Sequence, residues 1–462
     1  MANQALLTTQ AKLTAALQTY FSLTATIPAL QSPTVPLSTV YAFLSRSKEW
    51  MGLTELPTQD VAYLKQSQKN MIVAKRINSA DITLVAQRID WKTDTVYEEY
   101  SDTMDMFATD IAGNLVHNFY IKNSFDQVFK CLSNNGGAPS IVEPFFQPGQ
   151  YNTQNIFQST DGYKWKFMYT IDIGSKIKFM DSNWMPVPIG FNVPNSFQTS
   201  EGCGGVEVIN VINGGSGFSN SNVITVVITG DGTGATASVS GLDGSGSIQD
   251  IQVTNPGSNY TFANVSFISA SGSGAIVSAP TSPVGGHGFD PISELGCRNI
   301  MVSVEFESDE NLNGVSYLPT DIKYYQMGLV INPTDSQNFP SGSNTTIFKT
   351  TTDLQVSQGS GQFQFDEIVY QSTDGAYQNR FWEGTVLHYD DVNNVINTIN
   401  TTGSPITGAQ IYGQSSTTTR TLLTVTKPNY DLFSGYTIYL QNLDGVTRSS
   451  DGIEQFKIVL GH

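Results

Sequence analysis

Cysteines and long apolar runs are scarce in this sequence. Its 462 residues include three cysteines, Cys131, Cys203 and Cys297, which lie far apart and form no CxxC pair. This spacing argues against a disulfide framework and against a zinc site. We therefore expect the three cysteines to act as small, buried apolar side chains. We also expect the protein to be made in a reducing cytoplasm. No eighteen apolar residues follow one another, and the start lacks the basic beginning and apolar run of a secretory signal, so no membrane segment is predicted.

Basic residues are also scarce, and they are unevenly distributed. The chain has 23 Lys and Arg against 40 Asp and Glu, which gives a formal net charge of −17. Residues 1–200 hold 15 basic and 16 acidic side chains, which leaves 8 and 24 for residues 201–462. A nucleic-acid binder needs clustered Lys and Arg to displace counterions, so no nucleic-acid partner is predicted. The excess of acid is typical of a soluble, self-repelling surface.

The usual catalytic motifs are absent from the sequence. None of the four histidines, His117, His287, His388 and His462, belongs to an HExxH motif, and no GxSxG elbow precedes a predicted helix. We therefore predict no enzyme activity, no cofactor and no metal site. His287 is flanked by two glycines, and it is the histidine for which a functional role is most worth testing.

Two other classes of function stay open. The paired carboxylates of a glycoside hydrolase are defined by their separation in space, which a sequence with 40 acidic residues does not reveal. Exposed aromatic side chains such as Tyr377, Phe381 and Trp382 would stack on sugars, although aromatics in β modules usually form the core. A depolymerase and a glycan-binding protein are thus the alternatives to a structural role.

The composition favours strands over helices. Apolar residues make up 39% of the chain, aromatic residues 11% and charged residues 14%, and there are 41 glycines. These proportions are typical of folded β-rich proteins, and a chain of this length corresponds to about two to four domains. We predict a mainly β fold, a multi-domain β-sandwich core with a few helices and two inserted small β modules.

Two segments show helical periodicity. A helical segment is predicted within residues 1–36, with these residues on one face: Leu6, Leu13, Leu17, Tyr20 and Phe21. A second helix is predicted over 58–70, with Thr58 as its N-cap and Val61 and Leu64 on one face.

Short runs rich in β-branched and aromatic residues predict the core strands. The runs are 39–45, 71–77, 82–91, 115–122, 127–132, 163–172, 299–306, 324–331, 436–442 and 455–460. In 163–172, aromatic residues alternate with mostly polar ones at period two, which predicts one face packed against a second layer. The predicted core residues are Trp50, Trp91, Tyr163, Trp165, Phe167, Tyr169 and Phe306.

Residues 202–284 differ from the rest of the chain because they are rich in Gly, Ser and Thr and contain no Lys or Arg. Residues 206–218 align with 248–260 at an offset of 42, which predicts two repeats of about 42 residues that bury each other's apolar faces. The glycines are expected in tight turns. Calcium binding is a weaker alternative, because Asp231, Asp243 and Asp250 are isolated.

The composition also sets the expected domain boundaries. A discontinuous β-sandwich core is predicted from 37–201, 285–349 and 427–462, interrupted by the module at 202–284 and by a small β-barrel or sandwich at 350–426. The stretch Gly285 to Glu307 is where an ordinary core sequence resumes, and we expect Met301 to Phe306 to pair outside the inserted module.

Several core blocks, taken together, resemble the gene product eight family, the baseplate wedge proteins of T-even-type contractile-tailed phages. In the family's order, the blocks are TVYAFLSRSKEW (39–50), QRIDW (87–91), FKCL (129–132), DGYKWKFMYTID (161–172), GYTIYLQN (435–442) and IEQFKIVL (453–460). The similarity covers about 35–190, 285–335 and 428–461. The two insertions resemble the longer versions of cyanobacterial phages.

The resemblance implies a β-sandwich body and an elongated homodimer in the baseplate wedge of the virion tail. It also implies assembly in the host cytoplasm beside the family's partners, gene products six, seven and ten. It carries over no catalytic residue, because the family has none. A structural role in baseplate assembly and in its rearrangement on contraction is therefore the leading prediction, and host-surface glycan binding is the alternative.

Overall fold

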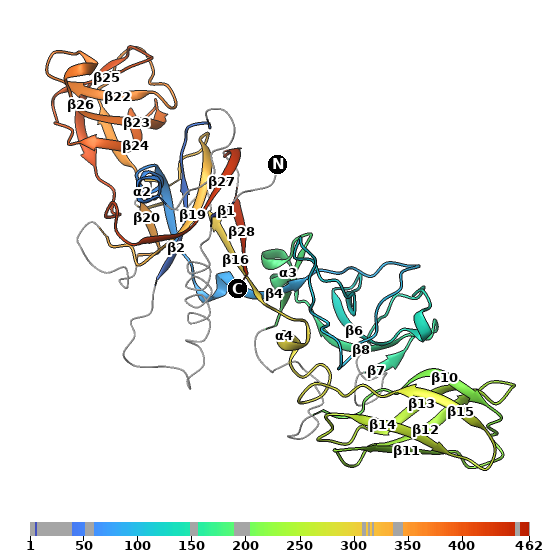
Figure 1. Cartoon of the computed structure of the whole chain (residues 1–462). Helices are drawn as coiled ribbons and strands as arrows, with labels where there is room; N and C mark the ends of the chain where they lie inside the picture. Colours follow the sequence, from blue (N-terminus) through green and yellow to red (C-terminus); the bar gives the residue numbers. More distant parts are fainter. Residues whose placement is uncertain are drawn as a thin grey trace. The chain divides into compact units, whose positions relative to one another are not determined.

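The computed structural model describes residues 5–6, 39–50, 60–147, 156–188, 204–306, 311–312, 315–316, 318–335, 345–448 and 453–461. Strands predominate among them, so the predicted mainly β, multi-domain fold is confirmed. The chain forms two compact units, residues 83–299 and residues 1–82 with 300–462, and both include strands from the core predicted above (Figure 1). No helix in the described ranges is long and apolar enough to cross a membrane.

The unit of residues 83–299 contains a four-stranded antiparallel sheet with the order β5-β6-β8-β7. Its strands are β5 (Tyr120–Lys122), β6 (Gln127–Ser133), β7 (Ile156–Gln158) and β8 (Lys164–Thr170). In the same unit, β4 (Ile82–Gln87) pairs with β9 (Trp184–Val187). The predicted strand at 115–122 is reduced to β5, and Leu115 instead forms an isolated β-bridge with Thr109 and donates its N–H to the Gln87 side chain.

The aromatic residues of the predicted strand 163–172 divide between two clusters, and all are buried except Phe167, which is partly buried. Trp165 stacks on Tyr163 with ring centroids 5.3 Å apart in one cluster, and Tyr169 belongs to the other. The β6–β8 register skips Met168, which is a β-bulge and interrupts the simple alternation. On the polar face, Lys166 is almost fully inaccessible to solvent, whereas Lys164 is partly exposed and Thr170 is exposed.

Two short helices flank this sheet in the chain. Helix α3 (Ile173–Phe179) directly follows β8, and Asp172 caps it by accepting a hydrogen bond from the Ser175 N–H. Helix α4 (Pro291–Glu294) begins with proline, whose missing N–H costs nothing at that position, and the Asp290 carboxylate caps it. A 3₁₀ turn, η3 (Asn135–Gly137), lies between β6 and β7 in sequence.

Residues 204–282 form a module of three two-stranded antiparallel sheets, drawn in green and yellow in Figure 1. The pairs are β10 (Asn210–Ser216) with β15 (Ser273–Ser278), β11 (Thr225–Gly230) with β14 (Ala263–Ile268), and β12 (Thr236–Leu242) with β13 (Ile248–Asn255). Every strand of the first half therefore pairs with a strand of the second half. Apolar side chains from all three sheets share one core.

The two halves of this module have equivalent geometry. The Phe218 N–H donates to Gly246 O at 3.0 Å, and 42 residues later the Tyr260 N–H donates to Gly204 O at 2.9 Å. Both donor residues, Phe218 and Tyr260, are buried. Gly215 and its counterpart Gly257 have φ values of 64° and 67°, a conformation that glycine adopts without strain.

The unit of residues 1–82 and 300–462 is built on a six-stranded sheet with the order β1-β27-β19-β2-β3-β20. Its strands are β1 (Ala5–Leu6), β2 (Val40–Ser45), β3 (Met71–Arg76), β19 (Lys323–Ile331), β20 (Ile347–Lys349) and β27 (Tyr436–Thr447). In the same unit, β16 (Asn299–Phe306) lies next to β28 (Glu454–Gly461), so Met301 to Phe306 pair outside the 204–282 module. The hairpin of β17 (Asn311–Leu312) and β18 (Val315–Ser316) follows β16 in the chain.

Two helix predictions need correction or lie outside the described residues. Leu6 is not helical, because it belongs to β1 and pairs with Leu440 of β27; the rest of the proposed N-terminal helix lies outside the described residues. The second helix is α2 (Val61–Lys69), and its N-cap is Asp60, whose carboxylate accepts from the Ala62 N–H. Val61 is exposed and not on a buried face. A 3₁₀ turn, η2 (Ser79–Asp81), precedes β4.

Residues 352–426 close into a six-stranded antiparallel barrel with the order β21-β24-β23-β22-β25-β26. Its strands are β21 (Thr352–Val356), β22 (Ile368–Ser372), β23 (Arg380–Asp390), β24 (Val395–Gly403), β25 (Gln410–Gly413) and β26 (Thr419–Thr426), with a 3₁₀ turn, η4 (Tyr377–Asn379), before β23. Closure leaves no free sheet edge. Trp382 and aliphatic side chains fill the interior.

Candidate functional site

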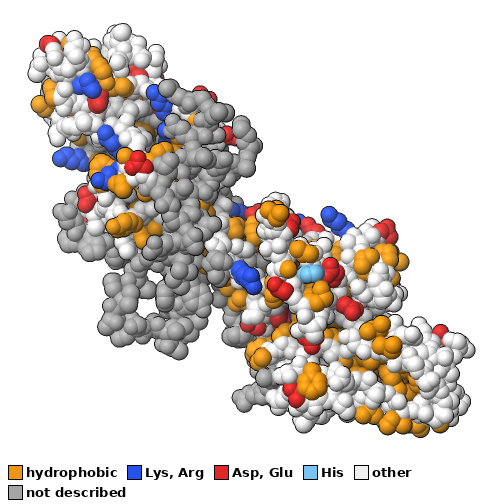
Figure 2. Space-filling model, viewed as in Figure 1, with side chains coloured by type: hydrophobic (Ala, Val, Ile, Leu, Met, Phe, Trp, Pro, Cys, Tyr) orange, Lys and Arg blue, Asp and Glu red, His pale blue; other side chains and the backbone are white. Residues whose placement is uncertain are grey.

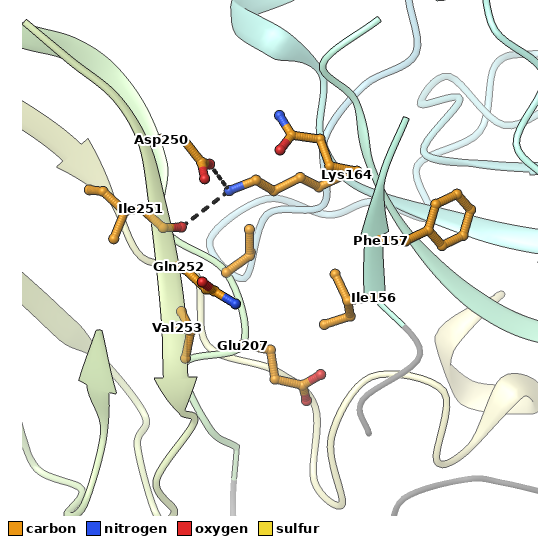
Figure 3. A pocket seen from close by; sticks show the side chains of 10 residues that line it. Ile156, Phe157, Lys164, Glu207, Asp250, Ile251, Gln252 and Val253 are labelled. Atoms are coloured by element: carbon orange, nitrogen blue, oxygen red, sulfur yellow. Dashed lines mark hydrogen bonds and ion pairs between the residues drawn. The ribbon is translucent and has the colours of Figure 1, made fainter. Parts of the chain in front are cut away.

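The 83–299 unit has a cleft of about 170 Å³ where β13 faces β7 and β8 (Figure 3). Lys164 spans it from β8, with Nζ 2.6 Å from Asp250 Oδ1 and 3.3 Å from the carbonyl oxygen of Ile251. Burial opposes ionisation of Asp250, but hydrogen bonds from Lys164 and Ser240 outweigh it and lower the pKa of this carboxyl. The ion pair thus fastens the inserted module to the sheet.

Glu207 connects the cleft to charged groups that are fully buried. Its Oε1 accepts a hydrogen bond from the His287 N–H at 2.8 Å, and its Oε2 lies 4.0 Å from Lys166 Nζ. Glu207 is at the entry to the module and His287 follows its exit. We call Lys130, Lys166, Glu207, His287 and Glu294 the buried ionic cluster.

The centre of the buried ionic cluster is Lys130 on β6. Its Nζ lies 2.9 Å from Glu294 Oε2 and 3.0 Å from His287 Nδ1. The side chains of Lys130, His287 and Glu294 are 0%, 0% and 1% exposed. The ring of Tyr100 covers the ammonium, with its centroid 3.8 Å from Nζ. Few charged groups in proteins are as completely removed from water.

Local backbone geometry brings Glu294 to this position. Gly288 has a φ of 83°, and a Cβ there would lie 2.9 Å from Cε of Lys166, so any larger residue would crowd the lysine. The Asp290 cap then starts α4 after one residue, and its single turn ends at Glu294. The Glu294 carboxylate folds back, and its Oε1 accepts from the N–H groups of Gly288 and Asp290 at 2.7 and 3.3 Å.

The pKa of His287 makes this site sensitive to acid. Burial lowers the pKa, and the neighbouring Lys130 ammonium lowers it further, although Glu294 and Glu207 act in the opposite direction. Since Lys130 only donates, His287 Nδ1 accepts, and His287 Nε2 has no hydrogen-bond partner among the described residues. The folded state therefore favours a neutral imidazole.

We expect the stability of this unit to fall as the pH is lowered from about 7 to about 5. The unfolded chain protonates His287 near the ordinary histidine pKa, whereas the folded chain resists protonation, so the stability is complete above about pH 6.5 and is lost below it. Urea denaturation at several pH values measures this change. The His287→Asn variant keeps an acceptor near Lys130 and should show a flatter profile. An unchanged profile would show that another group titrates.

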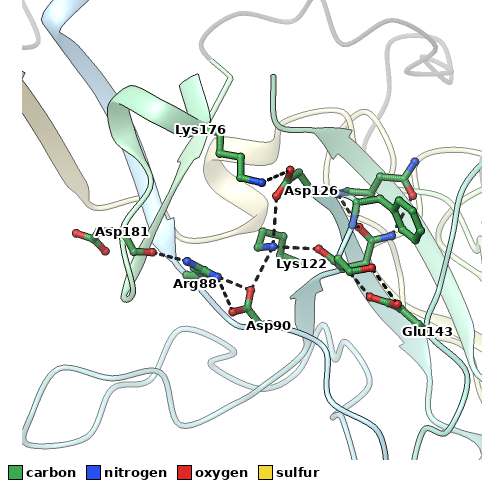
Figure 4. Close-up of polar contacts among 11 residues, drawn as sticks. Arg88, Asp90, Lys122, Asp126, Glu143, Lys176 and Asp181 are labelled. Atoms are coloured by element: carbon green, nitrogen blue, oxygen red, sulfur yellow. Dashed lines mark hydrogen bonds and ion pairs between the residues drawn. The ribbon is translucent and has the colours of Figure 1, made fainter. Parts of the chain in front are cut away.

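A second polar network holds the turn regions of the same unit (Figure 4). Arg88 donates from Nε and Nη2 to Asp90 at 3.0 and 2.8 Å, and Lys122 Nζ lies 3.4 Å from Asp90 and 3.5 Å from Asp126. Lys176 of α3 also contacts Asp126 at 2.7 Å. Burial opposes ionisation of Asp90, but Arg88 and Lys122 outweigh it and lower the pKa of this carboxyl. These opposite charges satisfy one another, which indicates a structural role.

The residues predicted for the core occupy different depths. Tyr163, Trp165, Tyr169 and Phe306 are buried, whereas Phe167 is partly buried and stacks on Phe146 at a centroid distance of 4.1 Å.

The other two predicted core residues, Trp50 and Trp91, are half-buried, and the structure gives both a polar contact. Trp50 donates from Nε1 to Leu443 O at 3.1 Å, and Trp91 donates from Nε1 to Ser140 Oγ at 3.1 Å. Of the cysteines, Cys131 is buried, Cys297 is half-buried, and both are free thiols; Cys203 lies outside the described residues.

The remaining described histidines each contact a different residue. His117 Nδ1 lies 2.6 Å from Glu98 Oε2, and His388 Nδ1 lies 3.4 Å from Asn397 Oδ1. His462 lies outside the described residues.

The three aspartates weighed as calcium ligands do not meet. Asp231 accepts from the Thr261 N–H and hydroxyl, Asp243 organises its own turn, and Asp250 pairs with Lys164. Within the described ranges, no group of three or more His, Cys, Asp or Glu side chains could hold a metal ion.

The proposed sugar-stacking residues require one correction. Trp382 is 1% exposed in the barrel core, so it is not a surface platform. Its neighbour Phe381 is 37% exposed, and Tyr377 is half-buried with its hydroxyl bound to Glu383 at 2.9 Å. A cleft of about 270 Å³ lies elsewhere on the barrel, and among its lining residues are Asp321, Gln362, Phe365, His388 and Asp391.

Sequence reasoning singled out His287 but missed its charged partners. Lys130 interrupts the apolar run VFKCL, and a lysine at a buried strand position is the one signal that indicates an internal counter-ion. Glu294 is 164 residues away and carries no local signal. No family model matches the chain, and no curated protein is detectably similar to it in sequence.

Proposed function

We propose that the chain is a structural component of the baseplate wedge of a contractile phage tail. In this role it forms a homodimer, contacts other wedge proteins and takes part in baseplate assembly and in the rearrangement on contraction. It is a virion protein without catalytic activity. Its partners are equivalents of gene products six, seven and ten.

The observation that carries this proposal is the position of the blocks on which the family resemblance rests. These blocks lie on or next to β2, β4, β6, β8, β27 and β28, which are strands of the two units, whereas the 204–282 module and the barrel each have a core of their own. Insertions with their own cores leave the rest of a structural protein unchanged. They supply extra surfaces for neighbours.

The chemistry of the described residues also supports a structural role. In the buried ionic cluster and in the Arg88 network, the charged side chains form ion pairs with other residues of the same chain. On the face drawn in Figure 2, the 204–282 module shows mostly uncharged polar and hydrophobic surface. The exposed apolar residues of the module as a whole include Ile212, Val223 and Ile268. Surfaces of this kind are typical of contacts between proteins.

We expect the chain to co-purify with the other wedge proteins of its phage and to be a dimer in solution. Co-expression followed by affinity capture tests the first point, and light scattering at micromolar concentration tests the second. A tail-tube protein of the same phage is the control for unspecific capture. A monomer that captures no wedge protein would contradict the proposal.

Glycan binding by the barrel is a second candidate, because the cleft beside Phe365 combines an exposed ring with two carboxylates and an amide. Sugar sites commonly join a stacking ring to such polar groups. Retention of the isolated chain on host surface polysaccharide, without capture of wedge proteins, would favour this candidate over the first.

A further inference from the structure

Lys130 and Glu294 bring an amine nitrogen and a carboxyl group into direct contact. The Nζ to Oε2 distance is 2.9 Å, and the carboxyl carbon is one bond beyond that oxygen. Two groups that a fold holds in contact gain a large effective molarity when they react, because the entropy of their encounter has already been lost on folding. Both side chains are buried, with exposures of 0% and 1%. Bulk water therefore does not compete for either group.

His287 is placed to carry a proton between the two groups. Its Nδ1 lies 3.0 Å from Lys130 Nζ and 3.6 Å from Glu294 Oε2. The Lys130 ammonium must lose a proton before its nitrogen attacks, and the Glu294 carboxylate must gain that proton on Oε2 before its carbon is attacked. A second proton from the nitrogen then lets Oε2 leave as water. A neutral imidazole between donor and acceptor is suited to both transfers.

The second carboxyl oxygen of Glu294 faces two backbone donors. The N–H groups of Gly288 and Asp290 donate to Oε1 at 2.7 and 3.3 Å. In acyl transfer, such a pair stabilises the negative charge that develops on the oxygen of the tetrahedral intermediate. Nucleophile, proton carrier and oxyanion donors thus converge on one carboxyl group.

We propose that Lys130 and Glu294 are joined by an isopeptide bond that forms spontaneously in the folded chain. Lys130 Nζ attacks Cδ of Glu294, the N–C bond forms, and the bond from Cδ to Oε2 breaks. The ammonium and the carboxylate together supply the atoms of one amide and one water, so no other reactant is needed. His287 moves the protons from Nζ to the leaving Oε2.

The product fits the same surroundings as the reactants. The new carbonyl oxygen, formerly Oε1, keeps the N–H groups of Gly288 and Asp290, and the new amide N–H donates to His287 Nδ1. Condensation also replaces two desolvated charges by one neutral group, which relieves the cost of burying an ion pair. The bond would tie β6 to the segment that leaves the module, so the sheet and the module exit could not separate under load.

The intact mass of the purified chain tests this inference. After denaturation, we expect a mass lower than that of the sequence by about 18 Da, the mass of one water. Residues 179–297 contain no Lys or Arg, so chymotrypsin is the better protease for mapping. Digestion should give one branched peptide that contains both Lys130 and Glu294.

Three variants distinguish a covalent bond between Lys130 and Glu294 from a non-covalent ion pair. Lys130→Arg keeps a cation beside Glu294 but has no amine to condense, so the mass deficit should disappear. His287→Asn should slow bond formation and leave a mixture of linked and unlinked chains. Lys166→Arg changes the neighbouring buried lysine, which lies 4.0 Å from Glu207, and should keep the full deficit.

A parent chain with its full sequence mass and with Lys130 and Glu294 in separate peptides would overturn the inference. So would an undiminished deficit in Lys130→Arg. The measurement uses the isolated chain, so its result does not depend on the baseplate role.

Discussion

The Lys130→Met variant is expected to lose about 3–5 kcal/mol of unfolding free energy, because it leaves the Glu294 carboxylate buried with neither an ion pair nor an amide bond to Lys130. Methionine fills most of the volume of the lysine stem, so the unpaired carboxylate and not a cavity dominates the loss. Guanidinium denaturation measures it as a lower transition midpoint.

The double variant Lys130→Met with Glu294→Gln identifies the cause of that loss. Glutamine removes the unpaired charge but keeps an oxygen that accepts from the Gly288 and Asp290 N–H groups. The double variant should therefore be more stable than Lys130→Met alone. Equal stability of the two variants would show that the unpaired carboxylate is not responsible.

The single Lys130→Met variant also has a characteristic pH dependence. Without Lys130, burial raises the pKa of Glu294 above its ordinary value, so protonation relieves the penalty at low pH and the deficit grows as the pH rises. A control is Lys176→Met, since Lys176 is 45% exposed in its pair with Asp126 and its loss should cost under about 1 kcal/mol.

Strands were well predicted where burial and β propensity coincide. The run 299–306 is β16 with the same ends, and 324–331 differs from β19 by one residue. The prediction was too long at 115–122, where Leu115 bridges Thr109 and donates its N–H to the Gln87 side chain, and only Tyr120–Lys122 form a strand. The contact with Gln87 joins residues 28 apart in the chain, so only the three-dimensional structure shows it.

The buried ionic cluster lay beyond sequence reasoning for a different reason. Its lysines are on β6 and β8, and their partners are on the two segments that enter and leave the inserted module. The alternation in β8 predicts a polar face for Lys164 and Lys166, and polar faces usually meet water. Here the module and α4 cover that face, so the charges must be paired internally.

The Trp382→Ala variant is expected to lose about 3–5 kcal/mol, because it removes a buried indole from a small, closed core. Trp382 packs among side chains from several barrel strands, including Leu354, Val369 and Leu422. A cavity of that size is not filled by relaxation in a barrel whose strands are all paired. Loss of the near-ultraviolet circular dichroism of the barrel aromatics and faster proteolysis of 352–426 would report it.

The adjacent residue provides the control for this variant and for the glycan hypothesis. Phe381 precedes Trp382 on β23 but points to the surface, with 37% of its area exposed, so Phe381→Ala should change stability by at most about 1 kcal/mol. Any loss of glycan retention in Trp382→Ala would follow from unfolding, whereas loss in Phe381→Ala or Phe365→Ala would report a lost surface contact. Equal midpoints for Trp382→Ala and Phe381→Ala would contradict the core position of Trp382.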